Sequence, residues 1–177
     1  MTRANEGAAT WPVDIYAALT AQEVRQVAYV PDAGLTALLG LCAADGAMEM
    51  VPLTTEEEGV ALLAGAWLGG QRGVLMMQSS GLGNCVNMFS LARTCRFPLL
   101  MLITMRGQWG EANPWQAPMG QITPDLLRLT GALVFPLERA DEAGETVGAA
   151  GRMVFNGSGS AAVLISQRLI GAKTFAR

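Results

Sequence analysis

The segment Val74-Leu-Met-Met77 runs directly into Gln78-Ser-Ser-Gly-Leu-Gly-Asn-Cys-Val-Asn87. A short apolar run that ends in small and polar residues is typical of a buried parallel strand that opens into a tight loop. Gly81 and Gly83 allow a sharp turn and leave space for another group to approach the backbone. We expect a helix to follow, with its free N–H groups and positive dipole end facing that space. Open α/β sheets bind ligands at such strand–loop–helix units.

Apolar runs alternate with helical patterns along the rest of the chain. The predicted strands are residues 26–30, 48–53, 73–78, 98–104, 132–136 and 161–166. The predicted helices are residues 13–22, 34–44, 56–69, 84–93, 123–130 and 140–155. This alternation predicts an α/β fold, a doubly wound and mostly parallel six-stranded sheet with helices on both faces. We expect one domain over residues 13–177, preceded by a flexible N-terminus at residues 1–12.

One connection is unusually long. Residues 105–122 contain glycine, proline and two tryptophans but no clear periodicity, so we predict a loop. Thr123-Pro124 is expected to begin the next helix, with proline in the first position, where it is favoured. A loop of this length suggests a function. Trp109 and Trp115 in this loop suit either packing at an interface or a lid over a substrate.

Composition excludes several classes of function. Of the 177 residues, 51% are apolar and only 15% are charged, which favours either an unusually enclosed sheet or a surface reserved for other subunits. A net charge of −3 without a basic cluster argues against binding nucleic acid. No apolar stretch reaches the ~18 residues expected of a membrane helix, and the first ten residues lack the apolar centre of a signal peptide.

Cysteine and histidine content narrow the chemistry. Cys42, Cys85 and Cys95 lie in apolar stretches, which predicts buried thiols and a cytoplasmic protein. Their spacing does not suit a zinc site, and we expect no bound metal on this chain. The chain has no histidine, which removes the commonest general base and every Ser-His or Cys-His pair. Any chemistry must therefore use carboxylates, arginines, backbone amides or a bound cofactor.

A cluster of carboxylates begins the helix predicted at residues 56–69. In Thr54-Thr-Glu-Glu-Glu-Gly59, Thr55 and Glu58 have the spacing of a capping box, and Glu56 and Glu57 suit the positive end of a helix dipole. The cluster therefore has a purely structural interpretation. The glycine loop has one as well, because it matches neither the Gly-x-Gly-x-x-Gly pattern nor the phosphate-loop pattern and can serve packing alone.

Together, these segments resemble a known family. Pro31-Asp32, Glu56-Glu-Glu-Gly-Val-Ala-Leu-Leu-Ala-Gly-Ala-Trp67, Met77-Gln-Ser-Ser-Gly-Leu-Gly-Asn84, Phe97-Pro-Leu-Leu-Met-Leu-Ile103 and Arg106-Gly107 look like the pyrimidine-binding domain of thiamine-diphosphate enzymes. The sulfopyruvate and phosphonopyruvate decarboxylases are most similar, and the chain resembles the alpha subunit of a split sulfopyruvate enzyme. The likeness extends over nearly the whole chain.

The resemblance implies a role for one glutamate. In the family, a glutamate at the start of this helix hydrogen-bonds N1′ of the cofactor's aminopyrimidine and so promotes removal of the thiazolium C2 proton. Counting nine residues back from Gly65 selects Glu56 as this catalytic residue, and Glu57 is the alternative. The same resemblance implies that Glu56, Gly81, Gly83 and Asn84 bind thiamine diphosphate.

The resemblance also implies a partner. Family members hold the diphosphate and Mg²⁺ on a second domain through a Gly-Asp-Gly motif, and Ala44-Asp45-Gly46 here lacks the first glycine. A separate beta subunit is therefore expected to carry the diphosphate-binding domain and Mg²⁺. The apolar composition further predicts that this chain self-associates, at least as a dimer.

The implied reaction is decarboxylation of a small anionic 2-keto acid, most simply sulfopyruvate to sulfoacetaldehyde and CO₂. Candidate substrate-binding residues lie where strands are expected to end: Pro31, Asp32, Gln78, Ser79 and Arg106. Arg106 alternatively forms an ordinary salt bridge to a helix carboxylate. Relatives tend to carry histidine in the loop after the fourth strand, and its absence here leaves the substrate open. Two other functions are compatible with the sequence, namely a non-catalytic assembly or regulatory subunit and a thiamine-dependent carboligase subunit.

Overall fold

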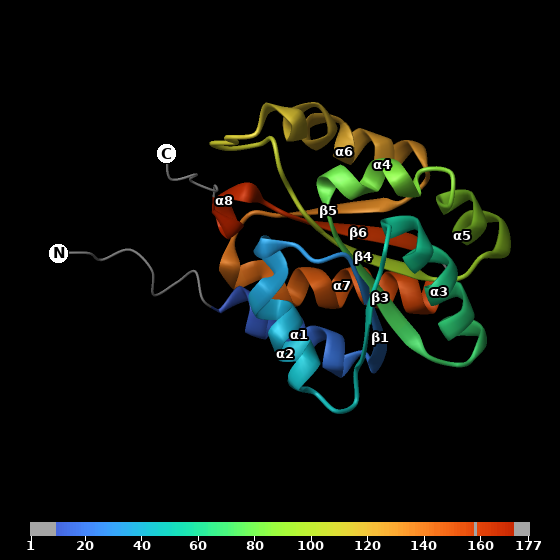
Figure 1. The fold of residues 1–177 in the computed structure, drawn as a ribbon. Coiled ribbons are helices and arrows are strands. Elements are labelled where there is room, and N and C mark those ends of the chain that lie inside the picture. Colours follow the sequence, from blue (N-terminus) through green and yellow to red (C-terminus); the bar gives the residue numbers. More distant parts are fainter. Residues whose placement is uncertain (1–9, 158, 172–177) are drawn as a thin grey trace.

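The computed structural model describes residues 10–157 and 159–171. They contain a six-stranded sheet with the order β2-β1-β3-β4-β6-β5, in which every pairing is parallel (Figure 1). The strands are β1 (Val24–Tyr29), β2 (Glu49–Pro52), β3 (Arg72–Gln78), β4 (Leu99–Thr104), β5 (Leu133–Leu137) and β6 (Ser160–Ile165). The predicted α/β fold with a parallel sheet is confirmed.

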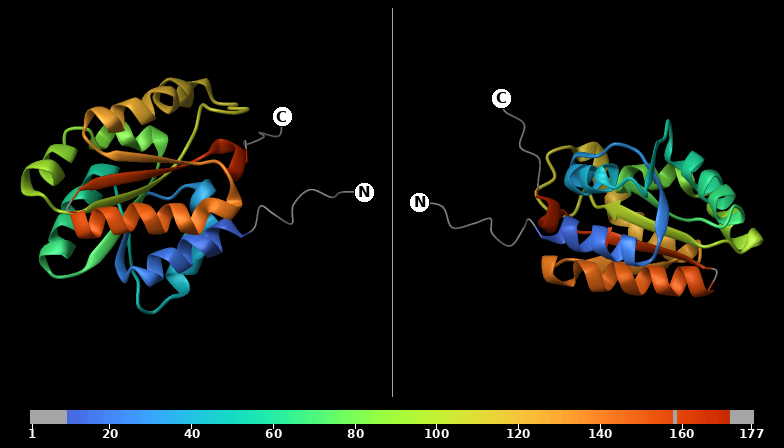
Figure 2. Two further views of the ribbon diagram at one scale, coloured as in Figure 1. Left: turned by 180° about the vertical axis from the view of Figure 1, so that it is seen from behind. Right: turned by 90° about the horizontal axis from the view of Figure 1, so that it is seen from below.

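Helices cover both faces of the sheet (Figure 2). One face packs against α1 (Trp11–Ala21), α2 (Thr36–Ala44) and α7 (Ala143–Gly157). The other face packs against α3 (Glu56–Leu68), α4 (Leu82–Cys85), α5 (Phe89–Cys95) and α6 (Ala117–Leu129). Each face therefore has its own apolar core, and side chains that alternate along β3 and β4 point into one core or the other. This arrangement explains why every residue of β4 is buried.

The direction of the chain across the sheet reverses beside β1. The chain passes from β1 outward to β2 and then returns to β3 on the opposite side of β1. Ligands of open parallel sheets bind outside the carboxyl ends of the strands at such a reversal. The loops that follow β1 and β3 therefore border the place where a ligand site is expected.

The segment after β4 differs from the prediction. It was expected to be a loop up to Ile122, but it contains a 3₁₀ helix, η3 (Pro114–Gln116), and α6 begins at Ala117. The prediction that Thr123-Pro124 starts this helix was wrong, because Pro124 lies inside α6 and Pro118 occupies its first turn. The early start depends on tertiary packing: a Cβ at Gly120 would overlap the carbonyl oxygen of Arg106, so α6 lies directly against the backbone that follows β4.

Smaller differences concern helix ends. The helix predicted over residues 84–93 is two helices, α4 and α5, separated by a turn at residues 86–88. A short helix not predicted from the sequence, α8 (Gln167–Ile170), follows β6. The predicted flexible segment 1–12 falls largely outside the described residues, and of its last residues Trp11 and Pro12 are buried in the first turn of α1.

The three cysteines differ in exposure. Cys42 and Cys85 are buried free thiols, as predicted, whereas Cys95 at the end of α5 is exposed, contrary to the prediction. Helix α5 ends at this residue, and Arg96 follows it in the left-handed conformation, so the chain turns at the surface. Within the part of the chain that the structure describes, none of the helices is both long and apolar enough to cross a membrane.

The packing of α3 on β3 provides a stability test with an internal control. A Cβ at Gly59 would come within 2.5 Å of Leu75 Cδ1 and 2.9 Å of Leu53 Cδ1, whereas a Cβ at Gly65 on the same helix would meet nothing within 4 Å. We expect Gly59→Ala to lower the free energy of unfolding by about 1–3 kcal/mol through overpacking. Gly65→Ala should leave it unchanged or raise it by up to about 1 kcal/mol, because alanine favours helix. Chemical denaturation of both variants measures the difference, and equal effects would contradict this packing.

Candidate active site

Glu56 is the first residue of α3 and one of the few buried acidic side chains, with 9% of its surface exposed. Asn84 in α4 donates a hydrogen bond of 2.8 Å from Nδ2 to Glu56 Oε2. Gly81 lies against the same carboxyl group, because a Cβ at this position would overlap Oε1 and Cδ of Glu56. The carboxyl group of Glu56 therefore packs against the loop that follows β3. Among the described residues, Glu56 Oε1 has no hydrogen-bond partner.

The predicted capping box is not formed. Thr55 is the N-cap residue of α3 but makes no side-chain capping bond, and its Oγ1 is buried without a partner in the described residues. Glu58 Oε2 instead accepts a hydrogen bond of 2.9 Å from the backbone N–H of Thr54. Glu58 thus stabilises the turn before the helix, while Glu56 faces Gly81 and Asn84. The adjacent carboxylates have different surroundings, and the side chain of Glu57 makes no hydrogen bond within the described part of the chain.

Cys85 lies beneath this glutamate and is fully buried. Burial, together with the nearby carboxylates of Glu56 and Glu57, raises the pKa of its thiol to about 12. The thiol is therefore protonated at neutral pH. It serves as an apolar packing group under the site and not as a nucleophile.

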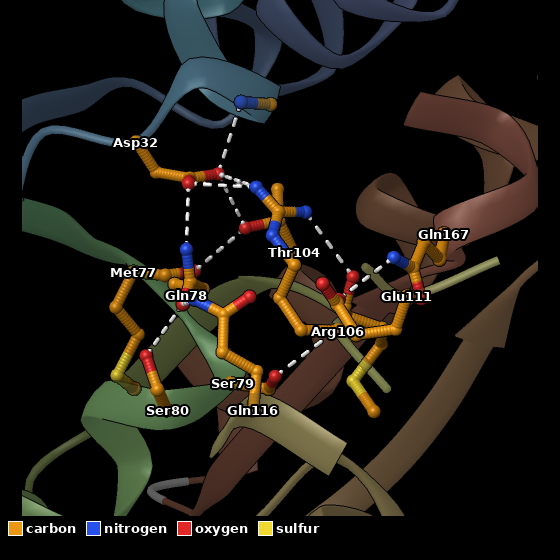
Figure 3. Close-up of polar contacts among 12 residues, drawn as sticks. Asp32, Met77, Gln78, Ser79, Ser80, Thr104, Arg106, Glu111, Gln116 and Gln167 are labelled. Atoms are coloured by element: carbon orange, nitrogen blue, oxygen red, sulfur yellow. Dashed lines mark hydrogen bonds and ion pairs between the residues drawn. The ribbon is translucent and has the colours of Figure 1, made fainter. Parts of the chain in front are cut away.

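A second polar group is centred on Asp32, which follows β1 and is 8% exposed (Figure 3). Its carboxylate pairs with Arg106, whose Nη2 lies 2.7 Å from Oδ1 and 3.0 Å from Oδ2. Gln78 Nε2 donates to Oδ1 at 2.9 Å, Thr104 Oγ1 donates to Oδ2 at 2.8 Å, and the N–H of Gly34 donates to Oδ2 at 3.0 Å. Asp32 therefore joins the carboxyl ends of β1, β3 and β4.

These partners fix the charge of Asp32. Burial by itself favours the neutral acid, but hydrogen bonds from Gln78 and Thr104, the charge of Arg106 and the N–H of Gly34 together hold the pKa of Asp32 below its usual value. Strand register explains the arrangement, because Gln78 and Thr104 are direct neighbours at the ends of β3 and β4. Asp32 is thus an anion at neutral pH, paired with a guanidinium group that is 4% exposed.

The segment after β4 is held against this group at two places. Gln116 in η3 donates from Nε2 to Gln78 Oε1 at 2.8 Å, and Ser80 Oγ donates to the same oxygen at 2.6 Å. Farther along the edge, Glu111 Oε2 accepts from Gln167 Nε2 at 2.9 Å and from the N–H of Gly107 at 3.2 Å. The segment that sequence reasoning treated as an open loop is therefore a structured cover over the ends of β3, β4 and β6.

The structure arranges the sequence-predicted residues in two groups. Asp32, Gln78, Ser79 and Arg106 lie together, and Ser79 Oγ accepts the backbone N–H of Arg106 at 3.0 Å. Glu56, Gly81 and Asn84 form the other group. Pro31 and Gly83 belong to neither: Pro31 lines an open groove of about 460 Å³ beside α2, and Gly83 is exposed near Met119. Arg106 makes a salt bridge, as the alternative interpretation expected, but its partner Asp32 lies in the turn after β1 and not on a helix.

Sequence reasoning missed several residues of the site. Thr104 was detectable in principle, because a polar residue at the end of an apolar strand is a signal for the carboxyl edge of a parallel sheet. Ser80 was detectable as well, because it belongs to the polar segment that directly follows β3. Three further residues carry no local signal, because tertiary contacts alone bring them to this edge: Glu111, Gln116 and Gln167.

The fold and the polar residues define an α/β protein whose candidate ligand site lies at the carboxyl edge of a parallel sheet, where one glutamate is buried. No protein-family model matches the sequence. In structure, the chain is similar to the 2-oxoglutarate:ferredoxin oxidoreductase from Magnetococcus marinus, with a TM-score of 0.75 over 91% of this chain and 29% of that one. At 14% identity this likeness concerns the fold alone.

Sequence comparison identifies the family. The chain is 36% identical to the sulfopyruvate decarboxylase subunit alpha of Methanococcus maripaludis, over 85% of this chain and 91% of that subunit. It is also 36% identical to the subunit of the same name from Methanothermobacter thermautotrophicus, over 85% and 92% of the two chains. A phosphonopyruvate decarboxylase of Streptomyces viridochromogenes is 43% identical over 66% of this chain, but only 30% of that enzyme is covered. The chain therefore belongs to the family of sulfopyruvate decarboxylase alpha subunits.

Proposed function

We propose that the chain is the alpha subunit of a split thiamine-diphosphate-dependent decarboxylase that converts sulfopyruvate to sulfoacetaldehyde and CO₂. The names of the relatives support a subunit of a 2-keto acid decarboxylase, and they favour this function over a non-catalytic subunit or a carboligase. When bound, thiamine diphosphate supplies the electron sink that decarboxylation of a 2-keto acid requires.

The observation that carries the proposal is the setting of Glu56. A cofactor pyrimidine needs a carboxyl group that can share a proton with its N1′ atom. Glu56 fits because Oε2 is held by Asn84, while Oε1 makes no hydrogen bond within the described residues. Gly81 has no Cβ, and a Cβ at this position would overlap the carboxyl group of Glu56. We assign proton transfer at N1′ to Glu56, with Glu57 as the alternative, and cofactor contacts to Gly81, Gly83 and Asn84.

Substrate contacts are proposed at the second polar group. Gln78 and Ser79 lie at the end of β3, beside the reversal in strand order, and Pro31 and Asp32 follow β1 on its other side. Because the guanidinium group of Arg106 is buried against Asp32, we assign Arg106 the role of fixing Asp32 and Gln78 in place. Contact between Arg106 and the distal anion of the substrate would require this salt bridge to open.

A partner subunit is part of the proposal. Two relatives named alpha subunits are covered over about nine-tenths of their length, whereas the phosphonopyruvate decarboxylase is covered over 30%, which supports a second chain that supplies the remainder. We propose that this beta subunit binds the diphosphate and Mg²⁺. Exposed apolar side chains on the same side of the molecule as the site, Trp109 and Trp115, are suited to contact it. We also propose self-association of the alpha chain and a cytoplasmic location, where Cys42 and Cys85 stay reduced.

Calorimetric titration tests the split site. The isolated chain, titrated with thiamine diphosphate and Mg²⁺, should bind weakly, because it offers contacts to the pyrimidine alone. The reconstituted complex of both subunits should bind in the micromolar range or tighter. Size-exclusion chromatography of the same samples gives the oligomeric state. Micromolar binding by the alpha chain alone would refute the proposed division of the site.

A further inference from the structure

The salt bridge between Asp32 and Arg106 has a consequence for substrate choice. We propose that Asp32 is a specificity-determining residue, which makes this chain's part of the substrate site electrically neutral and so selects a singly charged sulfonate over a doubly charged phosphonate. The inference rests on the proposed function and deepens it. Its basis is the charge distribution at the carboxyl edge of the sheet.

Asp32 fully engages the charge of Arg106. Two contacts of 2.7 and 3.0 Å join Nη2 to the carboxylate, and both side chains are more than nine-tenths buried. Arg106 Nη1 donates to the carbonyl oxygen of Met105 at 3.2 Å, and Nε is buried without a partner among the described residues. A ligand at this edge therefore meets a neutral ion pair and not a free guanidinium group.

The outer charges at the same edge oppose each other. Glu111 is an anion: burial raises the pKa of its carboxyl group, but the N–H groups of Asn113 and Gly107, the side chain of Gln167 and the charge of Arg106 lower it below the usual value. Arg168 in α8 is the cation, and its guanidinium group stacks 3.9 Å from the centre of the Trp109 ring. Because one negative and one positive group lie in the segments that follow β4 and β6 at this edge, their charges offset each other.

Neutral donors remain at the centre. The hydroxyl group of Ser80 and the amide group of Gln116 both reach Gln78 Oε1, and Asp32 fixes the opposite end of the Gln78 amide. The hydroxyl proton of Ser80 is used in this bond, whereas Gln116 Nε2 has a second N–H, and a neutral donor of this kind satisfies an oxygen of a monoanion at small cost. A dianion loses more hydration, because the cost of removing an ion from water grows with the square of its charge, and here it gains no net positive charge in return.

The test uses the reconstituted complex and compares kcat/KM for sulfopyruvate with kcat/KM for phosphonopyruvate near pH 8. Asp32→Asn leaves Arg106 unneutralised, which favours the dianion, and the sulfonate-to-phosphonate ratio should fall. A unit charge at about 7 Å, with an effective dielectric constant of ~20, changes such a ratio by about tenfold to fiftyfold. Arg106→Gln leaves Asp32 unpaired, and the ratio should rise. Thr104→Val removes a hydrogen bond to Asp32 without changing charge, so the ratio should stay as in the wild type.

A pH series on the wild-type complex provides a second measurement. A phosphonate dianion takes up one proton and becomes a monoanion with a pKa of roughly 6, as in a phosphate monoester, so the ratio should fall as the pH is lowered from 8 to 5.5. If Asp32→Asn fails to fold, Arg106→Gln and the pH series still decide. If the ratio of kcat/KM for sulfopyruvate to kcat/KM for phosphonopyruvate stays constant across the charge variants and with pH, the role of Asp32 in specificity is refuted while the proposed function stands. A wild-type complex that decarboxylates neither keto acid would overturn the proposed function, and this inference with it.

Discussion

Glu56→Gln in the reconstituted complex should lower the rate of decarboxylation by about 10²–10⁴-fold, the usual cost of removing one general acid–base group. Glutamine has nearly the same volume, and its amide oxygen can still accept the hydrogen bond that Asn84 donates to Glu56 Oε2 at 2.8 Å. What is lost is the ability to share a proton. The rate of proton exchange at C2 of the bound cofactor should fall in parallel, whereas the thermal unfolding temperature should change little.

The neighbouring glutamates are matched controls for this variant. Glu58 accepts the N–H of Thr54, so Glu58→Gln should cost about 1 kcal/mol or less of stability and leave the chemistry intact. Glu57→Gln tests the alternative assignment directly. An inactive Glu57→Gln together with an active Glu56→Gln would shift the catalytic position by one residue. Full activity in both variants would mean that these carboxylates only stabilise the N-terminal end of α3.

Gly81→Ala should abolish most of the activity without touching any ionisable group. Its Cβ would overlap Oε1 and Cδ of Glu56, so the carboxyl group has to move away from the loop that follows β3. A displacement of ~1 Å at a reacting group costs on the order of 10²-fold in rate. We therefore expect kcat to fall about 100-fold, with a loss of stability of about 1–3 kcal/mol from overpacking.

Gly65→Ala is the control for Gly81→Ala. Gly65 lies on α3, the helix that carries Glu56, and a Cβ at this position would meet nothing within 4 Å. Alanine at this position should retain activity within a few-fold of the wild type. Steady-state kinetics and thermal unfolding of the two variants separate a displaced glutamate from a general effect of losing a glycine. Equal activity in both variants would contradict the placement of Glu56 against Gly81.

The sequence by itself was sufficient for the fold class and for predicting that several polar residues lie at one edge of the sheet. Apolar runs such as Val74–Met77 alternate with helical segments, and strands buried on both faces are continuous in hydrophobicity because both sides of a parallel sheet are covered. Residues at the ends of predicted strands, such as Asp32, Gln78 and Arg106, could also be located, because the carboxyl ends of parallel strands share one edge.

Only the tertiary structure decided how these residues are connected. Whether Glu56 faces Asn84 or caps its own helix depends on the packing of α3 against the loop after β3, which lies in a distant part of the sequence. The salt bridge of Arg106 with Asp32 joins residues that are 74 positions apart. The early start of α6 likewise follows from close contact between Gly120 and the backbone of Arg106. Local patterns determine which segments become strands and helices, whereas the charge and orientation of the site arise from contacts between segments that only the folded sheet brings together.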